Sequence, residues 1–179
     1  LPATIAIARA YYAQAQGADG GYPHSRGEDP QALQLGQPIV FDLFPRQVGG
    51  GYFHDCTRTW SINYARPEVQ ALYDQVRHAF DLTLKTYAEP GQPLHTLQDA
   101  VQDYYEANGH PTARNTPGTA IGYMHGLGHG LGLNIHERPS ISHRETKDIF
   151  EKGNFITIEP GLYYPDKGIG MRIEDSFII

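Results

Sequence analysis

Glycine occupies every second position between residues 126 and 132, and this alternation restricts the backbone more than any other feature of the sequence. In a helix each of these glycines would cost about 1 kcal/mol relative to alanine, so four of them argue against helix formation. The segment is therefore expected to be extended, with glycine allowing another group to approach the backbone closely.

Three of the chain's nine histidines lie in or beside this segment, at His125, His129 and His136. His125 and His129 have the four-residue spacing of a two-histidine metal site on a helix. On extended backbone that spacing separates the imidazoles by about 13 Å, at about 3.3 Å per residue, so one ion cannot bind both. The segment therefore predicts one metal-ligating histidine, with separate histidines that contact substrate or orient other groups.

Hydrophobic periodicity predicts a mixed α+β chain whose strands favour hairpins. Helices are expected at residues 2–16, 67–88 and 97–107. Strands are expected at residues 38–44, 51–60, 155–159 and 169–179. Because the sequence opens on Leu1 and Pro2 and ends within a predicted strand, we expect a piece of a longer protein.

Two of the predicted hairpins each place two carboxylates opposite one another. In the later hairpin, a turn on the sequence Pro-Asp-Lys-Gly sets Glu159 opposite Glu174. In the earlier hairpin, a turn at residues 48–49 sets Asp42 opposite Asp55, and the neighbouring glycines supply the positive φ that tight turns need. The sequence therefore predicts two facing acidic pairs.

Facing side chains on antiparallel strands have Cβ atoms about 4.5–5.5 Å apart. Two carboxylates at that distance destabilise one another unless one is protonated or a cation lies between them. Exposed acidic residues could account for one such pair, but two pairs in otherwise apolar or aromatic strands favour divalent cations. Four carboxylates and one imidazole suit two ions of Mn²⁺, Co²⁺, Fe²⁺ or Zn²⁺, with room for a bridging hydroxide that would hydrolyse an amide or ester.

Composition narrows the range of partners. The chain of 179 residues has 40% hydrophobic and 19% charged residues, as expected of a globular protein. Its formal net charge of −6 disfavours a nucleic acid or a membrane surface as partner. The single cysteine, Cys56, cannot form an internal disulfide, so a cytoplasmic location is expected.

Four segments closely resemble the pita-bread metallopeptidases, the group of methionine aminopeptidases, Xaa-Pro aminopeptidases and proline dipeptidases. These segments are FDLFPRQVGGGYFHDCTRTW (41–60), MHGLGHGLGLNIHERPS (124–140), FITIEPGLYY (155–164) and GMRIEDSF (170–177). The resemblance implies the pita-bread fold, a curved antiparallel sheet with helices on its outer side. It also implies one catalytic metallopeptidase domain over residues 1–179, incomplete at its N-terminus because the family's upstream helices and N-terminal domain are absent.

The resemblance further implies a set of metal ligands for two divalent ions, with Mn²⁺ preferred and Co²⁺, Zn²⁺ or Fe²⁺ as alternatives. The implied ligands are Asp42, Asp55, His129, Glu159 and Glu174. Asp55 and Glu174 would bridge the two ions, and Glu159 would also act as the proton shuttle.

Four more residues acquire roles from the same resemblance. His125 and His136 would act in catalysis by contacting the substrate or the tetrahedral intermediate. His24 looks like the family's upstream substrate-binding histidine. Arg172 would orient Glu174 or the substrate.

The motifs HGLGHGLGL, TIEPGLY and MRIED resemble the proline-specific branch of the family. They imply an Xaa-Pro aminopeptidase or dipeptidase (prolidase), which uses a metal-bridging hydroxide to release the N-terminal residue of a peptide with proline in second position. Tyr123 or Tyr163 would contribute to an apolar proline pocket, and the assembly would be a homodimer. The alternatives are a methionine-aminopeptidase-type enzyme and a non-catalytic pita-bread module that binds peptides. Non-catalytic relatives typically lose metal ligands, whereas all five residue types are present here.

Overall fold

The computed structural model describes residues 8–9, 12–16, 20–23, 25, 32–86 and 89–179. The strands are β1 (Ala8–Arg9), β2 (Tyr12–Gln16), β3 (Pro38–Leu43), β4 (Arg46–Gln47), β5 (Cys56–Ser61), β6 (Gly128–Gly130), β7 (Glu137–Ile141), β8 (Phe155–Ile158), β9 (Gly161–Tyr164), β10 (Ile169–Arg172) and β11 (Asp175–Ile178). The helices are α3 (Pro67–Lys85) and α4 (His95–Ala107), and a single 3-10 turn spans Pro165–Lys167. Each ladder between these strands is antiparallel, as the predicted hairpins require.

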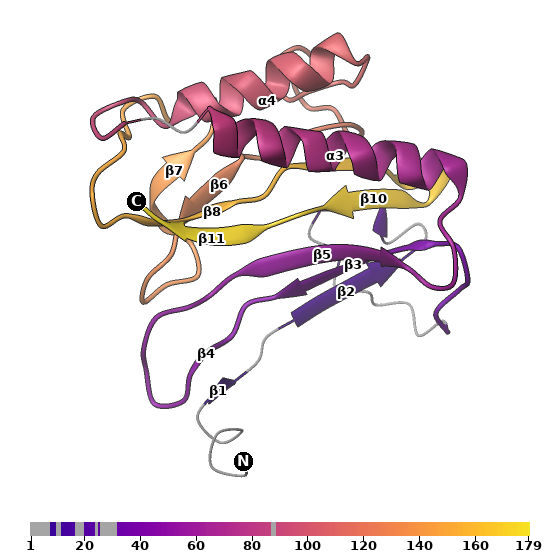
Figure 1. The fold of residues 1–179 in the computed structure, drawn as a ribbon, viewed down its shortest axis with the longest axis horizontal. Helices are drawn as coiled ribbons and strands as arrows, with labels where there is room; N and C mark the ends of the chain where they lie inside the picture. The colour runs from indigo at the N-terminus through magenta and orange to yellow at the C-terminus, as the bar shows by residue number, and fades with distance from the viewer. Residues whose placement is uncertain (1–7, 10–11, 17–19, 24, 26–31, 87–88) are drawn as a thin grey trace.

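Strand β10 lies between the helices and the N-terminal sheet. Helix α3 contacts β10 from one side, and strands β3 and β5 contact it from the other (Figure 1). The strand orders are β2-β3-β5, β11-β8-β6-β7, β9-β10 and β1-β4. Helices α3 and α4 pack against one another on the outer side of the C-terminal strands, so the predicted α+β arrangement with helices on one side of the strands is confirmed.

The hydrophobic core lies between the two helices and the C-terminal strands. Helix α3 begins at Pro67, where a missing amide hydrogen is tolerated because the first turn of a helix leaves its N–H groups unpaired. Both helices turn a regular apolar face inward. The buried residues of the core include Val69, Val76, Phe80, Leu97, Val101, Tyr105, Ile156, Ile158, Leu162, Met171 and Ile173. The two predicted helices at residues 67–88 and 97–107 are thus confirmed, with ends that differ by a few residues.

The prediction of a helix at residues 2–16 is wrong in the part that the structure describes. Residues 12–16 form β2, which pairs with β3 from Tyr12 opposite Leu43 to Gln16 opposite Ile39. Alanine favours a helix by only a fraction of a kcal/mol per residue, and tertiary context routinely overrides that preference. Here the open edge of β3 offers the segment a full ladder of backbone hydrogen bonds.

The later hairpin has the register that the sequence predicts. In the ladder of β8 and β11, Ile158 pairs with Asp175. The ladder of β9 and β10 continues the same register on the far side. Glu159 and Glu174 therefore lie opposite one another between the two ladders, and the prediction is confirmed.

The earlier hairpin differs from the prediction by two positions, because Asp42 pairs with Thr57 and not with Asp55. A shift of two positions leaves each side chain on the face that it would otherwise occupy, since successive side chains of a strand alternate between faces. Asp42 and Asp55 are therefore diagonal neighbours on one face of the hairpin, not directly opposed residues.

The shift arises in the turn. The bridge between Arg46 and Phe53 continues the register of β3 and β5, which centres the turn on Gly49 and Gly50 and not on residues 48–49. Gly49 and Gly50 have φ values of 89° and 118°. A β-branched residue such as Val48 is strained at positive φ, so the turn moves to two consecutive glycines.

The extended backbone predicted for the alternating glycines is confirmed in β6. A Cβ atom on Gly128 would lie 2.0 Å from the carbonyl oxygen of Thr157 in β8. A Cβ atom on Gly130 would lie 2.3 Å from the carbonyl oxygen of Arg138 in β7. Glycine at these two positions therefore lets β6 fit between its two neighbouring strands.

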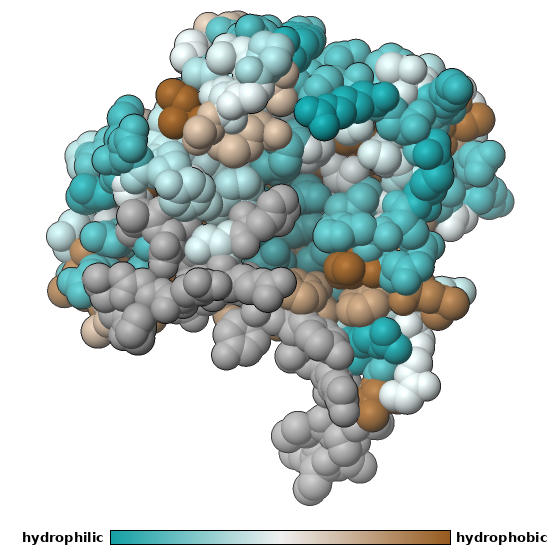
Figure 2. All heavy atoms as spheres, turned by 180° about the vertical axis from the view of Figure 1, so that it is seen from behind, coloured by the Kyte–Doolittle hydropathy of each residue, from teal (hydrophilic) through white to brown (hydrophobic). Residues whose placement is uncertain are grey.

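The face of the molecule opposite to the one in Figure 1 is mostly hydrophilic where the structure describes it, and its hydrophobic residues occur in small groups (Figure 2). Neither helix of the described residues combines the length and the apolar character needed to cross a membrane.

The substitution Gly128→Ala is expected to lower the free energy of unfolding by about 3 kcal/mol, because the methyl group would overlap the Thr157 carbonyl oxygen. Denaturant titration followed by circular dichroism measures this loss. The control is Gly153→Ala: Gly153 has a φ of 93° and nothing within 4 Å of an added Cβ, so only backbone strain is added. That strain amounts to about 1–2 kcal/mol. A Gly128→Ala chain as stable as the wild type would contradict the close approach of β6 and β8.

Candidate metal centre

Three of the predicted ligands converge from distant parts of the chain. Asp55 directly precedes β5, His129 lies in the middle of β6, and Glu174 lies between β10 and β11. Each offers one ligand atom, and these atoms lie within 4.8 Å of one another. The carboxyl groups are largely removed from water, since Asp55 is 5% exposed and Glu174 is 2% exposed.

The two other predicted ligands lie beside these three. The Nε2 atom of His129 lies 3.4 Å from Oε1 of Glu159 and 3.8 Å from Oδ2 of Asp55. Asp42 approaches from β3, and its carboxylate accepts a hydrogen bond of 2.6 Å from Arg172. The structure thus brings all five residues to one region, where the two hairpins meet.

Two carboxylate oxygens in this region are buried without a partner. They are Oδ1 of Asp42 and Oδ1 of Asp55, and neither accepts a hydrogen bond within the described part of the chain. Burying a carboxylate oxygen in that way is unfavourable unless another group compensates its charge. A divalent cation is such a group, and oxygen donors with one imidazole are a suitable donor set for it. The residues present therefore fit a metal centre.

The carboxyl groups have strongly perturbed acidities. Burial, then Glu174 and Asp42, raise the pKa of Asp55 from 3.8 to about 9. Burial is also the main cause that raises the pKa of Glu159 to about 8, with Asp55 and Asp42 adding to it and Arg172 opposing it. Burial and the neighbouring Glu159 raise the pKa of Glu174 well above its ordinary value. Without a cation the cluster therefore holds protons near neutral pH.

His129 is held in the form that a metal ligand requires. Burial lowers its pKa from 6.5 to about 4, so the imidazole is neutral at physiological pH. Its Nδ1–H donates to the carbonyl oxygen of Gly130 at 3.1 Å. The lone pair of Nε2 is then directed at Asp55 and Glu159, and the backbone bond fixes this tautomer and ring orientation.

Arg172 connects the acidic residues through its guanidinium, which is buried with only 3% of the residue exposed. Nη2 donates to Asp42 directly, and Nε donates to the Thr57 hydroxyl at 3.1 Å. The Thr57 hydroxyl in turn donates to Oε2 of Glu174 at 2.6 Å. Arg172 therefore orients Asp42 directly and contacts Glu174 only through Thr57.

His125 lies between two buried tyrosines. Its ring packs edge-on against Tyr123 and Tyr163, with ring centroids 5.2 and 5.4 Å away. Burial raises the pKa of Tyr163 to about 12, so its phenol is protonated and donates to Nε2 of His125 at 3.2 Å. The Nδ1–H of His125 donates to the carbonyl oxygen of Gly126 at 2.7 Å. Both tyrosines are fully buried, so they support the histidine and do not line an open pocket.

The two remaining predicted histidines differ in what the structure says of them. His136 packs edge-on against His129, with ring centroids 4.4 Å apart, and thus lies beside the cluster. His24 lies outside the described residues. Thr57 is not among the residues predicted from the sequence, although the two-residue period of a strand places it on the same face as Asp55.

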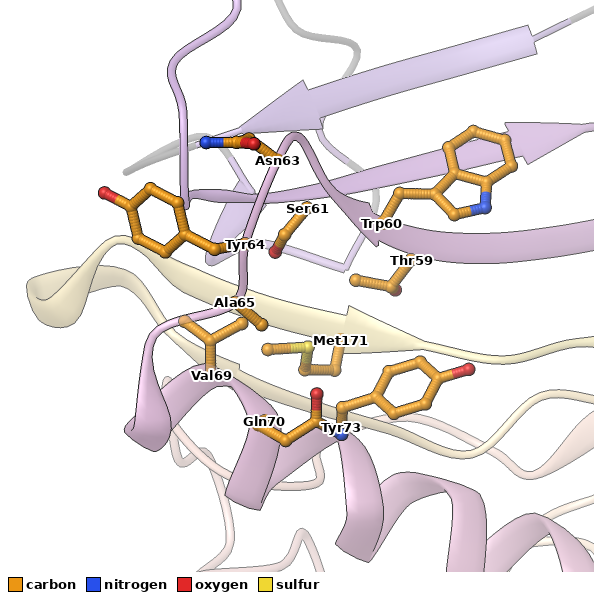
Figure 3. A pocket seen from close by; sticks show the side chains of 10 residues that line it. All are labelled: Thr59, Trp60, Ser61, Asn63, Tyr64, Ala65, Val69, Gln70, Tyr73 and Met171. Carbon is orange, nitrogen blue, oxygen red and sulfur yellow. The ribbon is translucent and has the colours of Figure 1, made fainter.

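A pocket of about 280 Å³ lies apart from this cluster, between the end of β5, the start of α3 and β10 (Figure 3). Its lining residues are Thr59, Trp60, Ser61, Asn63, Tyr64, Ala65, Val69, Gln70, Tyr73 and Met171. The described residues around it include no carboxylate and no imidazole, so it provides neither metal ligands nor an acid–base group of that kind.

The fold is that of a pita-bread metallopeptidase. Residues 9–179 match the profile of Metallopeptidase family M24, and the chain belongs to this family. The sequence is 32% identical over 168 residues to a Xaa-Pro dipeptidase of Pyrococcus furiosus, a match that covers 92% of this chain and 43% of that relative.

The fold of this chain is also similar to solved structures of peptidases. The prolidase from Pyrococcus furiosus superposes with a TM-score of 0.79 and 30% identity, over 94% of this chain and 45% of that chain. The X-Pro aminopeptidase from Thermotoga maritima has a TM-score of 0.80 and 28% identity, over 94% of this chain and 44% of that chain. This chain spans less than half the length of the curated relatives that it matches.

The raised pKa values of the buried carboxyl groups predict that the metal-free chain loses stability as the pH rises. Asp55 and Glu159 bind a proton with pKa values of about 9 and 8 when folded. Their pKa values are about 4 when unfolded, so their stabilising contribution is full below about pH 4 and is lost as the pH rises to about 9. His129 acts in the opposite sense, but only below its ordinary value of 6.5.

Thermal midpoints measured by circular dichroism with a chelator should therefore fall between pH 6.5 and 9. Saturating Mn²⁺ should reduce this fall, because a bound cation replaces the protons. Asp55→Asn removes one of the charges and should also flatten the profile. If the thermal midpoint falls equally with pH in the chelator-treated chain, in the Mn²⁺-bound chain and in Asp55→Asn, that result would count against the acidic cluster.

Proposed function

We propose that this chain carries the catalytic centre of an Xaa-Pro peptidase, an aminopeptidase or dipeptidase that hydrolyses the bond between an N-terminal residue and proline. The observation that carries the proposal is the convergence of Asp55, His129 and Glu174 within 4.8 Å in a largely buried region. Membership of a metallopeptidase family and similarity to proteins named Xaa-Pro dipeptidase and prolidase support it.

Two divalent cations, preferably Mn²⁺, would be held by the five residues of the cluster, which are Asp42, Asp55, His129, Glu159 and Glu174. Four carboxylates balance the charge of two dications, and the buried oxygens of Asp42 and Asp55 that lack partners would gain one. Bound there, the dications would make a water molecule more acidic and polarise the substrate carbonyl. A homodimer is part of the proposal, and sedimentation velocity would test it.

The chain's own side chains would supply binding and proton transfer. Glu159 would take a proton from the attacking water and return it to the departing proline nitrogen, since its carboxyl group lies beside His129 in the cluster. His125 and His136 would contact the substrate beside His129. The bonds from Tyr163 and to the Gly126 carbonyl would keep the His125 ring in one orientation.

The assay compares peptides that begin Ala-Pro with peptides that begin Met-Ala and with the dipeptide Ala-Pro, with Mn²⁺, Co²⁺ and Zn²⁺ supplied in turn. We expect cleavage next to proline. Glu174→Gln should abolish this cleavage and lower the bound metal, because it removes a ligand charge; elemental analysis measures the metal.

Glu151→Gln is the matched control, since Glu151 is an exposed glutamate outside the cluster, and it should behave as the wild type. Preferred cleavage of Met-Ala peptides would instead indicate a methionine-aminopeptidase-type enzyme. Peptide binding without cleavage would indicate a non-catalytic module. Full turnover by Glu174→Gln would be evidence against the assigned ligands.

A further inference from the structure

Thr57 is a fully buried residue in β5 whose hydroxyl lies between two ionisable groups. A hydroxyl has one proton, and the Thr57 hydroxyl uses it to donate to Oε2 of Glu174 at 2.6 Å. It must then accept from the Nε–H of Arg172, which lies 3.1 Å away. The two bonds have the same direction, from the Arg172 guanidinium through the Thr57 hydroxyl to the Glu174 carboxylate.

The backbone of Thr57 also holds Glu174. The Thr57 amide donates to the Glu174 carbonyl oxygen at 3.4 Å, and the Glu174 amide donates to the Thr57 carbonyl oxygen at 3.0 Å. Thr57 therefore holds both the backbone and the carboxylate of Glu174. The terminal torsion of a glutamate is otherwise broad, so the hydroxyl bond is what restricts rotation of the carboxylate.

We propose that Thr57 is a positioning residue of the metal centre, through which Arg172 orients the carboxylate of Glu174 for a divalent cation. This inference rests on the proposed function, because it assigns Thr57 to the same site. The Arg172 guanidinium then acts on both hairpins at once. It contacts Asp42 of the earlier hairpin directly and Glu174 of the later one through Thr57.

Thr59 provides a comparison within the same strand. It lies two residues further on, on the same face of β5, and is 8% exposed. Its hydroxyl donates to the Arg172 carbonyl oxygen at 2.9 Å and accepts from the Arg172 amide at 3.0 Å. Thr59 thus makes two buried hydroxyl bonds, as Thr57 does, but both are to backbone atoms and neither is to a carboxylate.

The experiment measures Mn²⁺ binding to the chelator-stripped 179-residue chain by isothermal titration calorimetry, with the thermal midpoint of each variant recorded by circular dichroism. Thr57→Val keeps the shape of the side chain and removes the hydroxyl. It should weaken Mn²⁺ binding by about tenfold to a hundredfold, the usual effect of losing a group that orients a metal ligand. If Thr57→Val does not fold, Thr57→Ala is measured in its place with the same expected loss.

Two further variants separate positioning from general stability. Thr57→Ser keeps the hydroxyl and should bind Mn²⁺ with nearly the affinity of the wild type. Thr59→Val should lower the thermal midpoint without weakening Mn²⁺ binding.

Three results would overturn the inference. Thr57→Val could bind as tightly as the wild type, Thr57→Ser could bind as weakly as Thr57→Val, or Thr59→Val could weaken binding equally. A wild-type chain that folds and binds no Mn²⁺ would instead contradict the metal centre of the proposed function, and this inference would fail with it.

Discussion

A pair of backbone hydrogen bonds between Thr57 and Glu174 joins the N-terminal strands of the chain to its C-terminal strands at the candidate site. The residues of this bridge are more than a hundred positions apart in the sequence. Because β5 carries the bridge, Asp55 and the neighbouring Asp42 reach the same buried region as Glu159 and Glu174. The acidic cluster therefore depends on this contact, since neither hairpin contains all four carboxyl groups.

The same contact also brings several buried carboxyl groups together, which is electrostatically unfavourable when they are ionised. It removes carboxyl groups from water and places them near one another, which raises the pKa values of Asp55, Glu159 and Glu174. Arg172 supplies one buried positive charge, and this is fewer than the four carboxylates require. The remaining charge must be balanced by protons or by cations, as in metal sites whose ligands lose their protons when the metal binds.

Much of this arrangement follows from the sequence, and the exceptions have physical reasons. Alternation along a strand fixes the face of each side chain, so Asp42 and Asp55 share a face although their predicted register is wrong by two positions. The exact centre of a turn depends on which residues accept positive φ. Because three consecutive glycines all accept it, the sequence alone does not determine which two of them form the centre of this turn. Residues 12–16 depart further, because the edge of β3 outweighs the helical preference of alanine. The two-residue period of a strand places Thr57 on the face of Asp55, but its contacts with Arg172 and Glu174 depend on how distant strands pack.

The alternating glycines connect the fold to the chemistry of the site. His129 stands between Gly128 and Gly130, each of which lies too close to a neighbouring strand to carry a side chain. The amide of His129 donates to the Thr157 hydroxyl of β8 at 3.0 Å, two residues before Glu159. This close packing of β6 and β8 brings the His129 imidazole next to the Glu159 carboxyl group. Glycine is thus required beside His129 because a larger residue would move β6, which carries His129, away from β8, which leads to Glu159.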